Sequence, residues 1–471
     1  MAYSLQYATF KQVLVTPENK ISFKRGGSSD SDKDPSVDSL DIKNSVVQCD
    51  YFEDLLSPSI TVRLLCSDTS ALLSLIPIRG YERIDLIIGT SYGDVKFTEE
   101  NGNPLYVSSI QKVSQVEGQE TFTLQCCTLT NLSNETARVM KRYEKGPISE
   151  HVRKILTDVL KIDEDRMSIE KSITSYGFIG NMRKPFYTIQ WLCPKAVPTT
   201  STVSGKSGDG VASEGKGTSG FFFYEDYDGY KFRSVDKMVD ATQVDYPDDS
   251  EKLSSEYGIP TYTHSTLITA NDETNNFKIL YAGIDKTTDV HKNLRVGLYS
   301  NLTYVYDPLK WNLDVVKYSL KDNVEQNNLK TAGDEVPIPK GDITNFASRV
   351  LVRMGDRGMW NPGLEESAED VEGQGRDPID MAKAFTRYSM LFQQSLNISV
   401  PCNPLLRVGG IIRVELPEVG DTHHGGPRGQ KKTDSEQSGF FVIRSVRHHF
   451  EITEGRNVTS LNLIRDSYGI Q

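Results

Sequence analysis

The sequence predicts an α+β protein, mainly β, in which two related small β-barrel domains carry inserted α/β segments. Three observations lead to this fold class. A pattern of strand, loop, strand, loop and hairpin occurs in the first third of the chain and again at its end. Helical periodicity is confined to the segments in between. With 471 residues, 37% of them hydrophobic and 25% charged, the chain has room for about three or four compact units.

The repeat can be followed residue by residue. Arg83 aligns with Arg413 and Asp85 with Glu415, at an offset of 330 (413 − 83). The matching segments are ITVRLLC (60–66) with LNISVPC (396–402), GYERIDLI (80–87) with GIIRVEL (410–416), and the hairpin sequences at 105–126 and 440–463. Two similar β modules separated by other material explain this order best.

We expect the first β-barrel domain, with an N-terminal segment, at residues 1–130, and an α/β linker domain at residues 131–250. Within the linker domain, the low-complexity polar tract 199–220 predicts a mobile loop. A strong hairpin should follow at 221–234, because aromatic strands flank an Asp-Tyr-Asp-Gly turn sequence.

Two helices are predicted in the linker domain. The segment PISEHVRKILTDVLKI (147–162) carries one apolar stripe at helical spacing, with Ser149 as the expected N-cap. The segment KPFYTIQWLCPKA (184–196) should begin a helix with Pro185 in its first position.

The second β-barrel domain is expected to be discontinuous. Its first part is predicted at 251–318, where the sequence is strand-like, and its completion at 393–471. An inserted segment at 319–392 separates the two parts, with one helix after Asp342 and another starting at Asp377.

Composition limits the classes of function. The net charge of −11 and the pI of about 5.3 do not provide the basic footprint of a nucleic-acid-binding protein. No apolar run approaches the ~18 residues that a membrane-spanning helix needs, and the N-terminus has no secretory signal pattern. Six scattered cysteines without a CxxC motif predict reduced, buried thiols, as expected for a chain made in the cytoplasm.

The chemical motifs favour structural interpretations. The aromatic hairpin lies among acidic residues, which opposes nucleic-acid stacking and favours a hydrophobic core. Asp226, Asp228 and Gly229 lack the further ligands of a calcium loop, so turn chemistry is favoured. His448 and His449 should point to opposite faces of a strand, and the pair at 423–424 lies in a Gly-rich loop. We therefore expect no catalytic, metal or cofactor site.

The repeated Arg-x-Asp/Glu pattern supplies the candidate site residues. Arg83 and Asp85 should share one strand face, as should Arg413 and Glu415, because strand side chains alternate. In a ring of barrels, these faces could line the channel or meet the neighbouring barrel, and a plain solvated face is an equally good alternative. In a channel, the acidic residues would discourage DNA from adhering.

The order of several segments resembles the baseplate hub proteins of contractile-tailed bacteriophages and is similar to the hub portion of the type VI secretion spike. The segments that carry this resemblance are SPSITVRLLCSDTSALLSLIPIRGYERIDLII, KPFYTIQWLCPKA, GFFFYEDYDGYKFRSVDKM, VPCNPLLRVGGIIRVELP, SGFFVIRSVRHHF and LNLIRDSYG. The resemblance implies two tail-tube-like barrels per chain and a homotrimeric ring that adapts a six-fold tail tube to a three-fold cell-puncturing spike.

The resemblance also implies partners and a location. The expected partners are further copies of the chain, a trimeric central spike protein and a tail tube or tube-initiator protein, with the tape measure protein and baseplate wedge as further candidates. DNA would pass through a central channel without specific binding, and no stable membrane insertion is expected. The location would be the tail baseplate of the virion, after assembly in the cytoplasm of the host bacterium.

Three alternatives remain at this point. The chain could be the hub of a phage-derived contractile injection or type VI-like secretion device, which only neighbouring genes would separate from a phage hub. It could be a hydrolase with an unrecognised site, although no GxSxG or clustered acid pair occurs in an interpretable context. It could also be a peripheral carbohydrate-binding tail protein, which exposed aromatic loops would favour.

Overall fold

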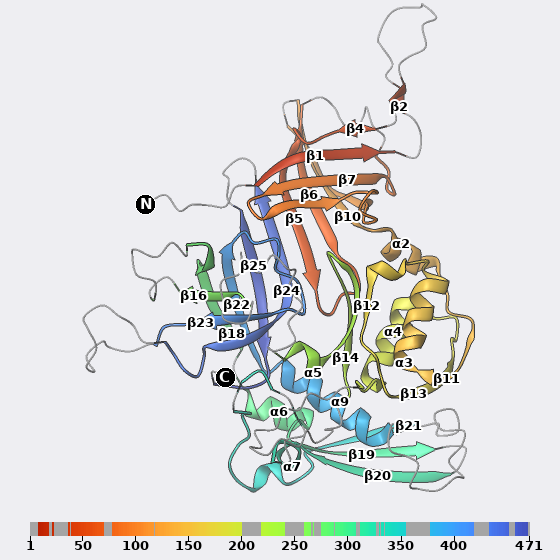
Figure 1. Ribbon diagram of the computed structural model, residues 1–471, viewed down its shortest axis with the longest axis vertical. Helices are drawn as coiled ribbons and strands as arrows, with labels where there is room; N and C mark the ends of the chain where they lie inside the picture. Colours follow the sequence, from red (N-terminus) through yellow and green to blue (C-terminus); the bar gives the residue numbers. More distant parts are fainter. Residues whose placement is uncertain are drawn as a thin grey trace, which may run out of the picture.

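The computed structural model describes residues 8–17, 21–22, 36–37, 39–69, 78–116, 118–199, 218–240, 259–264, 267, 275–286, 288–307, 311–325, 329, 331–333, 335–354, 377–418, 433–451 and 457–469. Strands dominate these residues, and helices gather beside and below the main sheet (Figure 1). The predicted mainly β fold is confirmed. Most of the predicted loop 199–220, together with His423 and His424, lies outside the described residues.

One antiparallel-rich sheet of 15 strands forms the body of the protein. The first half of the chain contributes β1 (Ala8–Thr16), β4 (Leu40–Asp41), β5 (Val46–Asp54), β6 (Thr61–Asp68), β7 (Arg83–Thr90), β8 (Gly93–Phe97), β9 (Leu105–Val116) and β10 (Gln119–Thr128). The second half contributes β16 (Thr261–His264), β17 (Lys278–Ile279), β18 (Tyr281–Lys286), β22 (Gln394–Pro401), β23 (Ile411–Glu415), β24 (Gly439–Glu451) and β25 (Val458–Arg465). A separate short pair is formed by β2 (Ile21–Ser22) and β3 (Ser36–Val37).

The two halves use the same order of neighbouring strands. In the first half the order is β5–β6–β10–β9–β7–β1, and in the second half it is β18–β22–β25–β24–β23–β16. The strands predicted from the sequence repeat occupy equivalent places in these two orders. One strand differs in direction, because β16 is parallel to β23 whereas β1 is antiparallel to β7.

The halves are not separate closed barrels. Strand β5 pairs antiparallel with β24 over seven residues, from Ser445 opposite Asp54 to Glu451 opposite Gln48. This pairing, called here the seam, joins both halves into one continuous sheet. The observed arrangement therefore differs from the predicted pair of independent barrels, because the two strand sets share hydrogen bonds across the seam.

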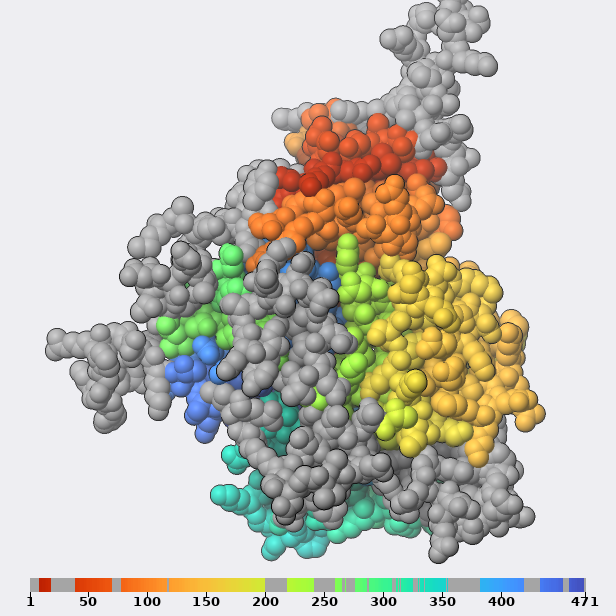
Figure 2. All heavy atoms as spheres, in the orientation of Figure 1, coloured from red at the N-terminus to blue at the C-terminus, as the bar shows by residue number. Residues whose placement is uncertain are grey.

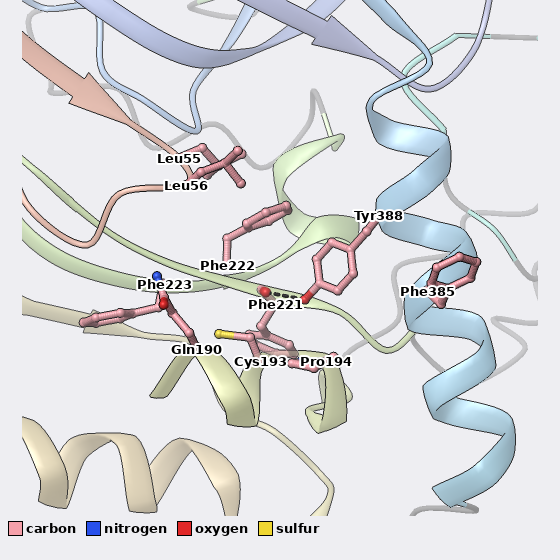
Figure 3. A pocket seen from close by; sticks show the side chains of 10 residues that line it. All are labelled: Leu55, Leu56, Gln190, Cys193, Pro194, Phe221, Phe222, Phe223, Phe385 and Tyr388. Carbon is pink, nitrogen blue, oxygen red and sulfur yellow. Dashed lines mark hydrogen bonds between the residues drawn. The ribbon is translucent and has the colours of Figure 1, made fainter. Parts of the chain in front are cut away.

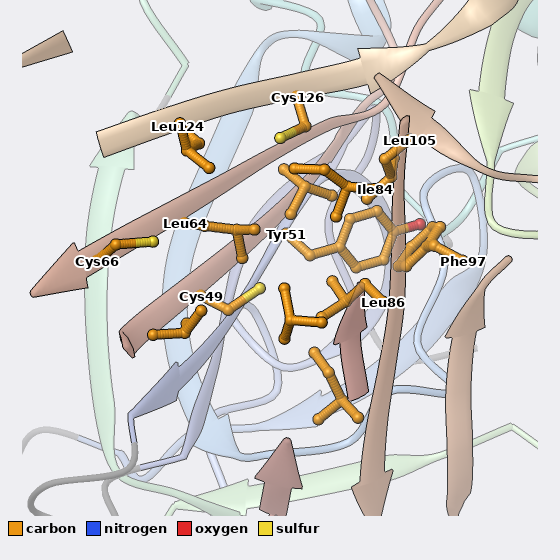
Figure 4. Close-up of a cluster of buried hydrophobic side chains, with 14 of the residues drawn as sticks. Cys49, Tyr51, Leu64, Cys66, Ile84, Leu86, Phe97, Leu105, Leu124 and Cys126 are labelled. Carbon is orange, nitrogen blue, oxygen red and sulfur yellow. The ribbon is translucent and has the colours of Figure 1, made fainter. Parts of the chain in front are cut away.

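Alternation along the strands builds a hydrophobic core in each half. In the first half, β6 and β10 bury every second side chain, and Tyr51 packs edge-on against Phe97 with ring centroids 5.0 Å apart (Figure 4). Labelled members of this core are Cys49, Tyr51, Leu64, Cys66, Ile84, Leu86, Phe97, Leu105, Leu124 and Cys126. The second half has its own cluster built from β22, β23, β24 and β25. Each half thus buries one face of its strands.

The linker segment forms a compact block beside the first half, seen as yellow spheres in Figure 2. Its elements are α2 (Leu129–Thr136), β11 (Arg142–Pro147), α3 (Ile148–Lys154), a π-helical turn (Ile155–Val159), a 3-10 turn (Glu164–Arg166), β12 (Met167–Ile169), β13 (Ser175–Ile179), α4 (Pro185–Leu192), a second 3-10 turn (Cys193–Lys195), β14 (Phe221–Asp226), β15 (Gly229–Ser234) and α5 (Val235–Met238). Strands β11 and β13 pair with each other, and β12, β15 and β14 form a small sheet.

Both predicted linker helices are present, with one correction. Pro185 begins α4 as expected. Ser149, however, is not an N-cap, because α3 starts at Ile148 after Pro147. The hydroxyl of Ser149 instead accepts a hydrogen bond from the backbone N–H of Ser172, and its own N–H donates to the Ser172 hydroxyl. The buried pairing to a neighbouring segment outweighs a local cap.

The insert forms a second small sheet at the opposite end of the molecule from β1 (Figure 1). Together with the segment just before it, the insert contains α6 (Val290–Val296), β19 (Ser300–Asp307), β20 (Asn312–Ser319), α7 (Leu320–Glu325), a 3-10 turn (Asp342–Thr344), β21 (Arg349–Met354) and α9 (Asp377–Leu391). The strand order is β20–β19–β21, apart from the main sheet. A further 3-10 turn (Asn275–Phe277) lies in the second half of the main sheet, where Phe277 packs on its core.

This small sheet corrects two expectations. Residues 251–318 were expected to form the first part of the second barrel, but within them β19 pairs with β20 and with β21 of the insert. The helix expected after Asp342 is only a short 3-10 turn. The helix expected from Asp377 is confirmed as α9. The short helix α6 lies in a segment predicted to be strand-like.

A buried ion pair fixes α9 to the C-terminal end of the sheet. The side chain of Arg387 is fully buried, and its Nη1 lies 2.8 Å from Asp466 Oδ2. Its Nη2 lies 3.4 Å from Asp236 Oδ1, so the same guanidinium also reaches α5 of the linker segment. Asp466 Oδ1 in turn accepts the N–H of Ala332 at 3.0 Å. One arginine thereby connects three segments far apart in the sequence.

We expect Asp466→Asn to lower the free energy of unfolding by about 3–5 kcal/mol, because it leaves a buried guanidinium only partly compensated. Urea titration followed by circular dichroism measures this change. The control is Lys141→Ala, which removes a solvent-exposed ion pair with Asp158 and should change the free energy by less than about 1 kcal/mol. Equal effects of both substitutions would contradict the proposed anchoring role of Arg387.

Candidate functional site

The candidate residues Arg83, Asp85, Arg413 and Glu415 form two equivalent ion pairs along their strands. Arg83 Nε lies 3.3 Å from Asp85 Oδ2 on β7, and Arg413 Nε lies 3.8 Å from Glu415 Oε1 on β23. The neighbouring apolar side chains, Ile84 and Val414 among them, point into the two cores. The predicted sharing of one strand face is confirmed for each pair.

Both ion pairs also hold neighbouring segments in place. Arg83 Nη1 contacts the carboxylate of Glu99, and the N–H of Glu99 donates to Asp85 Oδ1 at 3.1 Å. Glu415 Oε2 accepts a hydrogen bond from Thr263 Oγ1 on β16 at 3.1 Å. Both ion pairs therefore help to hold adjacent segments of the same chain together. Any role of these residues in a ring is an additional proposal.

A larger candidate surface is the outward face of eight consecutive strands, in the order β18–β22–β25–β24–β5–β6–β10–β9. Residue pairing places its side chains on one side of the sheet, opposite the cores. We call this surface the polar sheet face. Its members include Gly283, Asn397, Ser399, Ser460, Asn462, Ser445, Arg447, Asp54, Phe52, Arg63, Ser67, Thr121, Gln125, Ser109 and Gln111.

Small uncharged polar groups dominate the polar sheet face and bond to one another across strands. The hydroxyls of Ser399 and Ser460 lie 3.4 Å apart. Gln111 Nε2 donates to Gln125 Oε1 at 3.0 Å, and Gln119 Nε2 donates to Ser67 Oγ at 2.6 Å. Such cross-strand pairs stabilise the sheet without creating a strong field of either sign.

Charges on this face are concentrated at the seam and are paired there. Asp50 Oδ1 accepts from Arg447 Nε at 3.0 Å and lies 2.7 Å from His449 Nδ1. The guanidinium groups of Arg63 and Arg447 lie 5.7 and 5.8 Å from the centroid of the Phe52 ring. The seam is therefore held by side-chain contacts in addition to its ladder of hydrogen bonds. A depression of about 340 Å³ lies beside it.

His448 and His449 point to opposite faces of β24, as predicted. His448 is buried, its ring stacks on Tyr51 at a centroid distance of 5.5 Å, and burial lowers its pKa to about 3. A neutral imidazole is thus part of the core beneath the seam. Among the residues that the structure describes, no group of three or more His, Cys, Asp or Glu side chains could hold a metal ion.

Buried carboxylates connect the aromatic hairpin β14–β15 to both halves of the sheet. Glu53 accepts the N–H of Tyr227 at 3.0 Å with Oε1 and the N–H of Val408 at 2.9 Å with Oε2. Glu225 Oε2 accepts the N–H of Ile60 at 3.0 Å and the Thr128 hydroxyl at 3.1 Å. The hairpin is therefore a core element, as the sequence predicted, and no stacking platform.

The turn of the hairpin uses its first aspartate as predicted. Asp226 Oδ1 accepts the N–H groups of Asp228 and Gly229, each at 3.0 Å. Burial raises the pKa of Glu225 to about 7 and that of Asp226 to about 7, and it also raises the pKa of Glu53. These groups lie in the interior with their oxygens engaged, which gives them a structural rather than a catalytic setting.

An apolar cavity of about 380 Å³ lies where α9, α4 and the hairpin meet (Figure 3). Tyr388 projects from α9 towards the hairpin, and its hydroxyl donates to the backbone oxygen of Phe221. The lining is Leu55, Leu56, Gln190, Cys193, Pro194, Phe221, Phe222, Phe223, Phe385 and Tyr388. The lining contains no carboxylate or histidine, and burial raises the pKa of its Cys193 thiol and of its Tyr388 hydroxyl well above their ordinary values. Neither group is therefore poised for acid–base chemistry near neutral pH.

Comparison with known proteins gives one relative along nearly the whole chain. The chain is 19% identical over 434 residues to a probable baseplate hub protein, gp334, of Vibrio phage KVP40, and the match covers 90% of this chain and 91% of that protein. The predicted resemblance to baseplate hub proteins is confirmed. The chain matches no protein-family model.

Two solved structures also resemble the chain in fold. A tail protein from Neisseria meningitidis MC58 gives a TM-score of 0.49 at 12% identity, covering 98% of this chain and 97% of that chain. A chain of the Francisella PdpA–VgrG complex gives a TM-score of 0.40 at 10% identity, covering 98% of this chain and 59% of that chain.

No helix among the described residues is long and apolar enough to cross a membrane. Sequence reasoning found the Arg–carboxylate pairs but missed the seam and the polar sheet face. The alternating Ser and Asn residues of β22 and β25, at 395–399 and 460–462, were a readable signal for that face. The seam carries no local signal, because its partners are about 400 residues apart in the chain.

We expect the free energy of unfolding to fall as pH rises from about 4.5 to 7, to the extent that Glu225 and Asp226 control it. Folding raises both pKa values, from 4.5 and 3.8 to about 7. The folded chain then binds more protons than the unfolded chain in this window, so stability is present below the window and lost through it.

The substitution Glu225→Gln tests this expectation. The effect of this substitution on the free energy of unfolding should be roughly 1–3 kcal/mol more stabilising at pH 8 than at pH 4.5. The reason is that a neutral amide avoids the cost of burying a charge. Urea titrations across pH measure the difference. Glu164→Gln, at a solvent-exposed position, serves as the control. An unchanged pH dependence in Glu225→Gln would show that Glu225 does not titrate in this window.

Proposed function

We propose that the chain is a structural hub of a phage tail baseplate. Three copies would form a ring that adapts a six-fold tail tube to a three-fold spike and leaves a central channel for DNA. The observation that carries this proposal is the repeated strand order in one chain, because three copies then present six similar units. The full-length similarity to a probable baseplate hub protein supports it.

The polar sheet face is the surface that we assign to the channel. Its eight strands per chain would give 24 strands in a trimer (3 × 8), enough to line a wide opening. Its groups are mainly uncharged, and its charges at the seam are paired. A channel lined in this way would neither attract phosphates strongly nor hold them by specific contacts. DNA could pass without adhering.

The two ends of this eight-strand sheet are suited to joining neighbouring copies. Among the described strands, β18 pairs only with β22 at the level of Tyr281–Lys286. At the other end, β9 pairs with β7 at Leu105 and Tyr106, and the backbone of Val107 bonds to Tyr81 and Glu82 just before β7. Residues 108–116 therefore bond, within the strands that the structure describes, to β10 alone. Open edges are templates for strand addition. We propose that β18 of one copy meets β9 of the next.

The Arg–carboxylate pairs would then lie outside the channel. Arg83 with Asp85 and Arg413 with Glu415 sit on β7 and β23, which do not belong to the eight strands. We assign them to contacts with neighbouring units or with the tube and spike proteins. In this arrangement each half of the chain is one tube-like unit. The linker and insert segments are attached to these units and do not form part of the ring of strands.

We expect three copies of the purified chain, 158 kDa in total (3 × 52.7 kDa), to associate either alone or in complex with the spike protein, whose own mass adds to that total. Multi-angle light scattering measures this mass directly. A monomer under both conditions would remove the main support for the ring, while leaving the fold unaffected.

The proposed contact between copies predicts a specific disulfide. Asp285→Cys on β18 is combined in turn with Ser109→Cys and Gln111→Cys on β9, because all three side chains lie on the polar sheet face. All six native cysteines are buried, so the introduced thiols report on the contact. Under mild oxidation at least one pair should give covalent trimers on a denaturing gel. The control pair Asp285→Cys with Val315→Cys should not. If the chain forms trimers but neither pair cross-links, the interface lies elsewhere.

A further inference from the structure

The small sheet β20–β19–β21 has one face that no other described element covers. Register places Leu313, Tyr306 and Met354 in one row across the three strands, and Val315, Tyr304 and Val352 in the next. Val352 and Met354 each expose 76% of their surface. Exposed apolar patches of this kind mark interaction sites in proteins that are otherwise well packed.

The opposite face of the same sheet shows what a covered face looks like here. It packs against α9, and Thr303, Val305 and Tyr318 are buried there. Asn301 Nδ2 donates to Thr386 Oγ1 of α9 at 3.3 Å. Contacts of its inner face therefore hold the sheet in place, whereas no other described element packs on its outer face.

Exposure is greatest on β21, which is also an edge strand. Among the described residues, β21 pairs only with β19, in parallel register from Arg349 to Met354. On the outer face, its residues Val350, Val352 and Met354 are all apolar. Natural edge strands usually carry charges or proline that prevent strand addition. This edge lacks such protection on its apolar face.

The size of the face limits its occupant. Three strands about 4.8 Å apart, each with three alternate residues about 7 Å apart, cover on the order of 300 Å². A stable interface between two folded partners needs about 800 Å² on each side. Face-to-face packing of a second copy is therefore too small to be stable. A strand added beside β21 would gain main-chain hydrogen bonds as well as apolar contacts.

Charge on the inner side of the edge specifies the added strand further. Arg349 of β21 lies on this side, where its Nη1 donates to the backbone oxygen of Val296 at 3.4 Å and its guanidinium lies 5.3 Å from the centroid of the Phe385 ring. It forms no ion pair with a carboxylate of the described residues. Alternate side chains of an added strand would point towards this guanidinium group, and the others would extend the apolar face.

We propose that the outer edge of β21 is a docking site for an extended segment of a partner chain with alternating apolar and acidic side chains. The apolar side chains would cover Val352 and Met354, and the acidic ones would face Arg349. This docking site does not rest on the proposed ring or on the hub function, and the two can fail independently.

A fluorescent eight-residue peptide with alternating Val and Glu residues is the probe, and anisotropy with the full-length chain is the measurement. The wild-type chain should bind it, and the double variant Val352→Asn with Met354→Gln should weaken binding by roughly tenfold. The matched control, Leu313→Gln with Val315→Asn on β20, removes similar apolar groups from the same face and should change binding by less than about twofold.

A second peptide, with Thr in place of Glu, tests the charge. Arg349→Gln should weaken binding of the acidic peptide by about threefold and leave that of the neutral peptide unchanged. Absence of binding to the wild-type chain would overturn the proposal. So would equal losses in the β20 and β21 variants, which would indicate an unspecific apolar surface. The proposal would also be overturned if the wild-type chain associates with itself and the β21 variant does not, because a second copy would then be the occupant.

Discussion

The rest of the architecture depends on the pairing of β5 with β24. β24 is 13 residues long and uses one edge for two partners in succession, β23 at Gly439–Val442 and β5 at Ser445–Glu451. Its other edge pairs with β25. One strand thus belongs to both halves, and the ladder of hydrogen bonds fixes their register. If β24 slipped by one residue, its inward and outward side chains would exchange faces.

Buried polar groups define how the other segments sit on this sheet. Glu53, which lies in the seam opposite Val446, accepts N–H groups from the hairpin turn and from the loop before β23. At the far end of the sheet, the side chain of Arg387 in α9 forms ion pairs with Asp236 of α5 and with Asp466, which follows β25. Such groups are costly unless every partner is in place, so they select one arrangement among many apolar packings of similar stability.

Much of this fold was accessible from the sequence because its signals are local. The aromatic hairpin, α4 with Pro185 and the duplicated strands each follow from short-range patterns. Helix α6 was missed although Asp289 caps it and Gly297 ends it in a left-handed conformation. The strand-like sequences on both sides outweighed the helical pattern of its seven residues. The candidate ion pairs were placed correctly along their strands. The face most suited to function was not found, since it exists only after distant strands align.

The six cysteines give the chain an unusual indifference to oxidation. All are buried and unpaired, and burial raises the pKa of Cys66 and Cys402 to about 12. Thiolates, the species that oxidants attack, are therefore scarce at neutral pH. A chain synthesised under reducing conditions and later exposed to air would form no disulfides from its own cysteines, because its thiols are buried. Contacts between copies would then not depend on the redox state of these six residues.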